Sequence, residues 1–155
     1  VAGDVLAASL RELLDDPFYW DPADEYAPHG NDTGADLLEA FREWRRRHRN
    51  VPAARFLPTM LKRWNYTGSV DALLGKPMSQ WDDDDELTLE VLDEANVAVA
   101  FAQLKLEGKC DEDVRLAALQ SIARQLDPAV HDHFGWTLPE EQRERLEQMQ
   151  SKLLG

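Results

Sequence analysis

A single cysteine, Cys110, occurs in the 155-residue chain, so no disulfide can form within it. The sparing use of cysteine fits the reducing cytoplasm, which is the compartment we expect. Cys110 follows Lys109 at a predicted helix start, where a thiol can be acidified. No particular histidine is indicated as its base, so the pattern does not predict a catalytic nucleophile.

Long apolar runs are missing as well. The longest uncharged stretch near a helix centre, residues 95–104, is about half the length that a membrane-spanning helix needs. Residues 1–14 contain Asp4 and Glu12 and no basic amino-terminal region, so we expect no signal peptide there. The sequence therefore predicts a protein that neither crosses nor enters a membrane.

Positive charge is scarce. The chain has 17 basic and 30 acidic residues and a net charge of −13, and each third of the sequence shares the excess. Such a surface repels phosphate backbones and anionic lipids, so we expect no nucleic-acid or membrane partner. It favours association with a basic protein, because opposite charges accelerate encounter. The one basic cluster, residues 45–49, is expected to pair with acidic neighbours within the chain.

Alternating polar and apolar residues, the pattern of half-buried strands, are not found between turn signals. Apolar residues recur instead at helical spacing, and 43% hydrophobic content is sufficient for a core. The prediction is an all-α fold, a compact single-domain bundle of about five or six helices over residues 1–155. A long aromatic and proline-rich loop should follow the first helix.

Caps and breakers place the helices. We expect a first helix at 3–14, a second from the Asn31–Thr33 caps to Arg47, and short helical segments at 52–56, 58–64 and 69–74, the last capped by Ser69. Further helices are predicted from Asp111 to Leu126, with Ala123 inward, at 128–134, and from a Thr137–Glu140 capping box to Leu154. Gly75 and Gly108 are expected helix ends.

The most regular element is predicted from the Asp82–Asp85 run to Leu106. One face carries Leu87, Val91, Leu92, Ala95, Ala98, Val99, Ala102 and Leu106, and a second face carries Val97, Phe101 and Leu104. A helix that is apolar on two faces is usually central. We therefore expect Val91, Ala95, Ala98, Val99 and Ala102 among the most buried residues.

The loop at 15–33 is rich in aromatic residues. Tyr19, Trp20 and Tyr26 are candidate binding residues, because Tyr and Trp are favoured anchors in protein interfaces. The alternative is that these rings cover the core, as in a packed loop.

An acidic run is the second candidate binding surface: Asp82, Asp83, Asp84, Asp85 and Glu86. The alternative for this run is a structural role, since acids at a helix start cap it and complement its dipole. It lacks the glycine and the spacing of a calcium-binding loop.

Four carboxylates, Glu86, Glu90, Asp93 and Glu94, fall on one helical face and form an alternative metal site. This spacing resembles the helical acidic clusters of the all-α nucleotide pyrophosphatases, although their tandem Glu-Glu pattern is missing. His131 and His133 lack a second pair of metal ligands. No glycine-rich phosphate loop is found, so no cofactor is predicted.

These observations favour a protein that acts by protein–protein binding, such as an adaptor, an inhibitor or an immunity-type module. The alternative is a metal-dependent hydrolase that acts on a phosphate-containing small molecule. The two hypotheses predict different structures. A hydrolase needs the four carboxylates to line a concave pocket, whereas a binding module leaves them on a convex face.

Overall fold

The computed structural model describes residues 14–66 and 70–155, and the regular secondary structure of this part of the chain is entirely helical, with no strand. It holds seven α-helices: α2 (Asp32–Arg47), α3 (Phe56–Arg63), α4 (Val70–Gly75), α5 (Asp83–Glu107), α6 (Glu112–Leu126), α7 (Pro128–Phe134) and α8 (Glu140–Leu154). Three 3₁₀ turns accompany them: η1 (Pro17–Trp20), η2 (Ala53–Arg55) and η3 (Met78–Gln80). The predicted all-α fold is confirmed.

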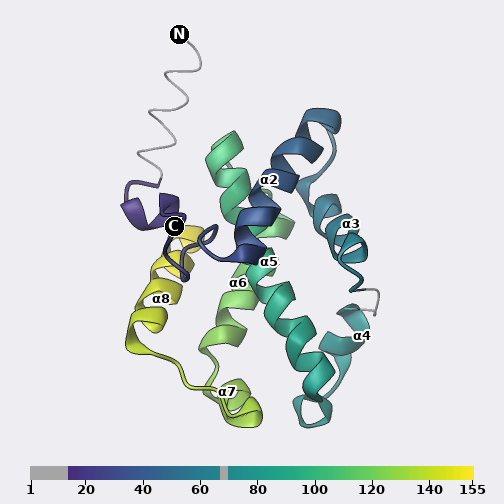
Figure 1. Ribbon diagram of the computed structural model, residues 1–155, viewed down its shortest axis with the longest axis vertical. Helices are drawn as coiled ribbons and strands as arrows, with labels where there is room; N and C mark the ends of the chain where they lie inside the picture. Colours follow the sequence, from purple (N-terminus) through teal and green to yellow (C-terminus); the bar gives the residue numbers. More distant parts are fainter. Residues whose placement is uncertain (1–13, 67–69) are drawn as a thin grey trace.

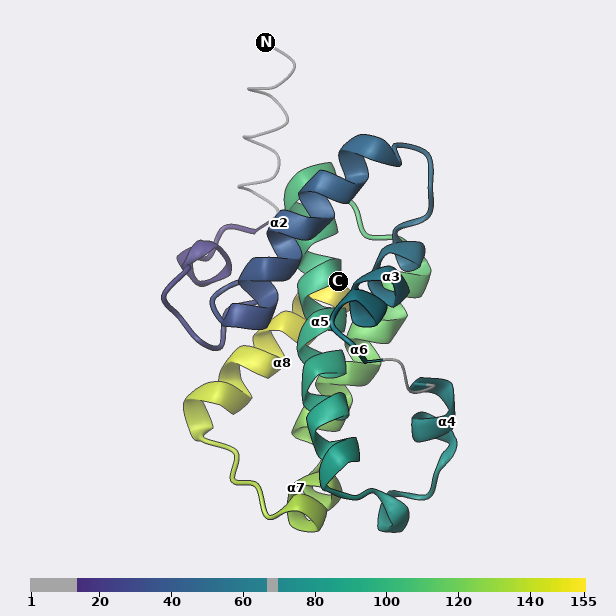
Figure 2. The same cartoon turned by 45° about the vertical axis from the view of Figure 1, so that its right-hand side comes forward.

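The helices are arranged around α5, which runs through the middle of the molecule (Figure 1). Helices α2 and α6 pack directly on α5, and α8 packs on the outer side of α6. Figure 2 shows α3 and α4 on the side away from α8, with η3 and α7 near the first turn of α5. The long helix therefore has neighbours on most of its circumference.

The sequence of α5 explains its central position. Ala95, Ala98 and Ala102 have no exposed surface, and their small side chains let neighbouring helices approach closely. Val99 is buried too, as predicted, but Val91 is only half-buried. Leu87 is 60% exposed, so the predicted apolar face does not extend to the first turn of the helix.

Both ends of α5 are fixed by capping residues. The Asp82 carboxylate accepts a hydrogen bond from the Asp85 N–H, and the Asp85 carboxylate accepts one from the Asp82 N–H, which is a reciprocal capping box. At the other end Gly108 adopts φ 72°, the left-handed conformation that glycine tolerates best.

The capping box predicted for the last helix is wrong. Helix α8 begins at Glu140 with Pro139 as the N-cap, and no side chain caps it. A residue before proline is disfavoured in the α conformation, so Leu138 cannot easily serve as the first helical residue after Thr137. Ala123, predicted to face inward, is exposed.

The segment before α2 is more ordered than the predicted irregular loop. Asp16 caps η1 by accepting a hydrogen bond from the Phe18 N–H at 2.9 Å, and η1 places Phe18 and Tyr19 in the core. Asp16 also accepts a hydrogen bond from Gln148 of α8 at 2.8 Å. Asn31 caps α2, as predicted, through the Gly34 N–H at 2.7 Å.

Three other predictions concern the helix ends and the basic cluster. The helix predicted at 3–14 and the Ser69 cap lie outside the described residues, apart from the buried Leu14. Pro58 lies inside α3 rather than at its start. In the basic cluster Arg45 pairs with Glu107 at 2.8 Å and Arg46 with Glu43 at 3.0 Å. Within the described ranges, no helix is both long and apolar enough to cross a bilayer.

Candidate functional site

The three aromatic residues of the predicted binding loop have different environments. Tyr19 is only 3% exposed, and its ring stacks on Phe101 with the centroids 5.2 Å apart, so its prediction as a surface anchor is wrong. Burial raises its pKa to about 12. Tyr26 is half-buried against the core. Trp20 is 44% exposed, and its Nε1 donates a hydrogen bond to the Leu14 carbonyl at 2.8 Å.

Most of the acidic run is used within the fold. Asp82 and Asp85 form the capping box of α5, and Lys76 pairs with Asp85 at 2.9 Å. The Glu86 carboxylate accepts a hydrogen bond from Trp136 Nε1 at 3.1 Å. Asp83 and Asp84 are exposed and make no ion pair within residues 14–66 and 70–155.

The aromatic loop and the acidic run do not form one surface. The Lys105 ammonium lies 4.9 Å from the Trp20 ring centroid near the end of α5, whereas Asp82 caps its start. A helix of 25 residues is about 37 Å long, so the two candidates lie at opposite ends of the molecule. A small partner surface cannot contact both together.

The predicted metal-binding face is divided between different roles. Asp93 is buried, and both of its carboxylate oxygens accept hydrogen bonds from Arg124, the shortest at 2.6 Å. Glu90, Asp93 and Glu94 line one concavity of about 320 Å³ together with Trp136 and polar residues that include Gln125 and His131, and Glu90 and Glu94 are exposed. Among the described residues, no three histidine, cysteine, aspartate or glutamate side chains converge to hold a metal ion.

The electrostatics of this face follow from burial and crowding. Burial raises the pKa of Asp93, and the Arg124 ion pair opposes that shift without cancelling it. Desolvation by the surrounding protein, together with neighbouring carboxylates, raises the pKa of Glu90 and Glu94. Carboxylates that lie close together repel one another, which disfavours their charged forms.

Substitution of Asp93 tests whether this face is structural. Asp93→Asn keeps the shape but removes the charge that Arg124 contacts, so we expect the free energy of unfolding to fall by about 2 kcal/mol. Glu90→Gln on the exposed side should leave it unchanged. Urea denaturation with and without Mg²⁺ measures both variants. A Mg²⁺-dependent stabilisation of the parent that Glu90→Gln abolishes would support the metal-site hypothesis.

The histidine pair and the cysteine lack reactive surroundings. His131 Nε2 contacts the Gln125 carbonyl at 2.5 Å, whereas His133 Nε2 contacts the Trp81 carbonyl at 2.9 Å, so the two rings serve different segments. Burial raises the pKa of the Cys110 thiol to about 11, and the nearby Asp111 carboxylate adds to that shift. The thiol is therefore protonated near neutral pH.

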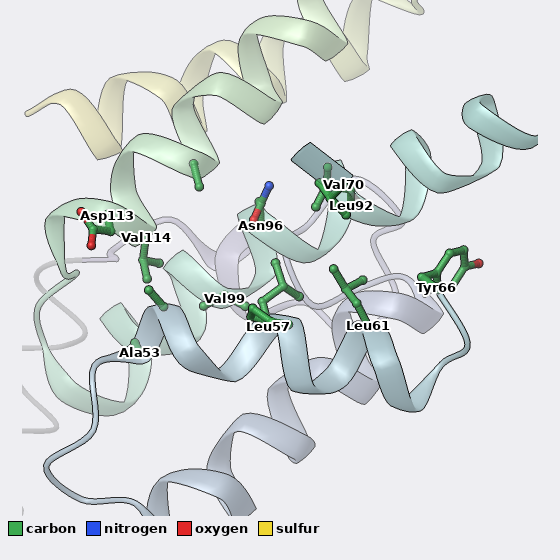
Figure 3. Close-up of a pocket in the computed structure, with 13 residues that line it drawn as sticks. Ala53, Leu57, Leu61, Tyr66, Val70, Leu92, Asn96, Val99, Asp113 and Val114 are labelled. Carbon is green, nitrogen blue, oxygen red and sulfur yellow. The ribbon is translucent and has the colours of Figure 1, made fainter. Parts of the chain in front are cut away.

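A groove that sequence reasoning missed lies between α3 and α6, with α5 as its floor (Figure 3). Its volume is about 400 Å³. Leu57 and Leu61 extend from α3 toward Leu92 and Val99 of α5. Val114 of α6 and Ala53 of η2 close one end, and Tyr66 and Val70 line the other end.

The lining of this groove is mostly apolar. Its polar members are Asn96, which donates a hydrogen bond to Ser121 Oγ at 3.0 Å, and Asp113 and Tyr66 near the ends. Asp113 is exposed, is the only charged residue that lines the groove, and makes no ion pair within the described ranges. The arrangement suits an apolar occupant with a positive group at one end.

Comparisons of the chain with protein-family models, curated proteins and solved structures give no match. The groove and the cavities therefore have to be interpreted from their own chemistry.

Proposed function

We propose that this protein is a binding module that receives an amphipathic helix of another protein in the groove between α3 and α6. The observation that carries the proposal is the mostly apolar groove, whose walls and floor are helices and whose lining residues Leu57, Leu61 and Val99 are each less than 10% exposed. Grooves of this kind bind the apolar face of a partner helix, which presents residues at positions i, i+3 or i+4, and i+7.

The dimensions define the occupant. Helix α3 has eight residues and is therefore about 12 Å long, so the groove wall matches roughly two turns of a partner helix. Asp113 at one end suits a lysine or arginine of that helix. The net charge of −13 also favours a basic partner, because it accelerates their encounter. High salt should weaken this attraction by screening the charges.

The binding experiment uses helical peptides. A displayed library of amphipathic helices is selected against the full chain, and the selected peptides are measured by fluorescence anisotropy. Ala117→Arg places a large cation on the groove rim in α6, and we expect it to weaken binding at least about tenfold, or 1.4 kcal/mol. The matched control is Ala123→Arg, an exposed alanine of the same helix outside the groove lining.

The outcomes separate the candidate surfaces. The selected peptides should carry a basic residue at one end of an apolar stripe, and 0.5 M salt should lower their association rate. Equal binding to the Ala117→Arg and Ala123→Arg variants would contradict the groove. Loss of binding on Trp20→Ala, with Ala117→Arg unaffected, would place the contact at the aromatic loop instead.

A further inference from the structure

A second site is built around a buried cation, Lys105 in the last turns of α5. The residue is only 8% exposed, and its ammonium lies 2.8 Å from Nδ1 of the buried His29. His29 Nε2 lies 2.9 Å from the Ala98 carbonyl, which can only accept a hydrogen bond. Nε2 therefore carries the proton, and Nδ1 accepts from Lys105.

This cation lacks an anionic partner. Within residues 14–66 and 70–155 no carboxylate forms an ion pair with Lys105. The other buried charge of α5 differs, because Asp93 is fully paired with Arg124. Buried charges are normally paired, so an unpaired ammonium next to empty space indicates a place for an anion.

A cavity of about 200 Å³ lies beside this ammonium. Its apolar walls are Trp20, Pro22, Leu38 and Leu106. The charged and titratable groups that face it are His29 from the loop before α2, Arg42 from α2, Asp21 after η1, and Lys105 itself. Arg42 forms an exposed ion pair with Glu39 at 2.6 Å, and the Asp21 carboxylate accepts a hydrogen bond from the Ala23 N–H.

We propose that this cavity binds a small organic monocarboxylate, whose carboxylate group accepts a hydrogen bond from the Lys105 ammonium while its apolar body lies against Trp20, Pro22 and Leu38. Of the three N–H groups of the ammonium, one serves His29, so others are available to a ligand. The cavity is smaller than the 300 Å³ or more of sites for drug-sized ligands, which sets the size of the ligand to one ring or a short chain.

The protonation of Lys105 gives the site a pH signature. Burial and the nearby Arg42 lower its pKa to about 8. An anion at the ammonium favours the protonated form, so the ligand and the proton bind cooperatively. Affinity for the carboxylate should be constant below this pKa and should fall as the pH rises through about 8.

Benzoate is the probe, titrated into the full chain by calorimetry, with benzamide as its uncharged analogue. We expect benzoate to bind at pH 7, benzamide to bind at least about tenfold more weakly, and Lys105→Met to lose benzoate binding by a similar factor. Lys105→Met removes a buried charge without an anionic partner but leaves His29 Nδ1 without its donor, so circular dichroism is used to show that the variant is folded before binding is measured. Lys109→Met, at an exposed lysine outside the cavity, is the matched control.

Several results would overturn the proposal. They are the absence of benzoate binding to the parent, equal binding to a folded Lys105→Met variant, or equal affinity for benzamide. Acetate binding as tightly as benzoate would contradict the proposed contact between an apolar ligand body and Trp20, Pro22 and Leu38. An affinity that does not fall between pH 7 and pH 9.5 would exclude the Lys105 ammonium as the group that holds the anion.

Discussion

Gly34→Ala is expected to lower the free energy of unfolding by about 3 kcal/mol or more, as overpacking at a rigid contact does. A Cβ atom at this position in the first turn of α2 would lie 2.1 Å from the Pro28 carbonyl oxygen and 3.1 Å from Asn31 Oδ1. Both atoms are held in place. Asn31 caps α2 through the Gly34 N–H, and Pro28 precedes His29, which bonds to Ala98 and Lys105.

Gly75→Ala is the matched control for this substitution. Gly75 ends α4, and a Cβ atom there would meet nothing within 4 Å. Alanine in a compatible helical position stabilises by up to about 1 kcal/mol, because it restricts the unfolded chain. Urea denaturation of the two variants gives both values. A Gly34→Ala variant as stable as the parent would show that the backbone at Pro28 can move away from the new Cβ atom with little loss of free energy.

Acid should destabilise the fold through His29, by an amount on the order of 4–5 kcal/mol at pH 3. Burial lowers the pKa of His29 to about 3, and the Lys105 ammonium adds to that shift, whereas an unfolded histidine titrates at 6.5. Between these values the unfolded chain gains a proton that the folded chain does not take up. Stability is therefore full above pH 6.5 and is lost as the pH falls toward 3.

His29→Gln isolates this contribution from that of the carboxylates, which also titrate in acid. The glutamine amide donates to Ala98 and accepts from Lys105 but does not ionise in this range. Denaturant midpoints at pH 7, 5 and 4 give the stability of each protein. We expect the variant to lose less stability than the parent at each step down in pH. Parallel pH profiles would mean that His29 is protonated within the fold.

The sequence predicted the helices well where the caps and the periodicity agreed. Asn31 and the Asp82–Asp85 run begin helices as expected, and Gly108 ends α5. Errors arose where one local rule opposed another, as at Pro139, where a proline overrode a Thr-x-x-Glu pattern. Others arose where burial depends on neighbours, as for Leu87, which is apolar but has little packed against it.

The candidate sites were much harder to predict. Leu57, Leu61 and Val99 have the sequence pattern of ordinary core residues. They line a groove because α3 and α6 are separated in the fold, which the sequence does not indicate. The contact between Lys105 and His29 joins residues 76 positions apart, so no local spacing indicates it. Tyr19 and Trp20 are adjacent in sequence, yet one is buried and the other exposed, because η1 orients them differently.

The hydrogen bond between Asp16 and Gln148 has a consequence for the order of folding. It joins residues 132 positions apart, and Arg145 of the same helix lies 4.3 Å from the Phe18 ring centroid. Contacts over such a span incur a large loop-closure entropy, whereas α5 and α6 are joined by a short turn and pack locally. On a ribosome, the α5–α6 hairpin can form while α8 is still unmade, and η1 is secured only after Gln148 has emerged.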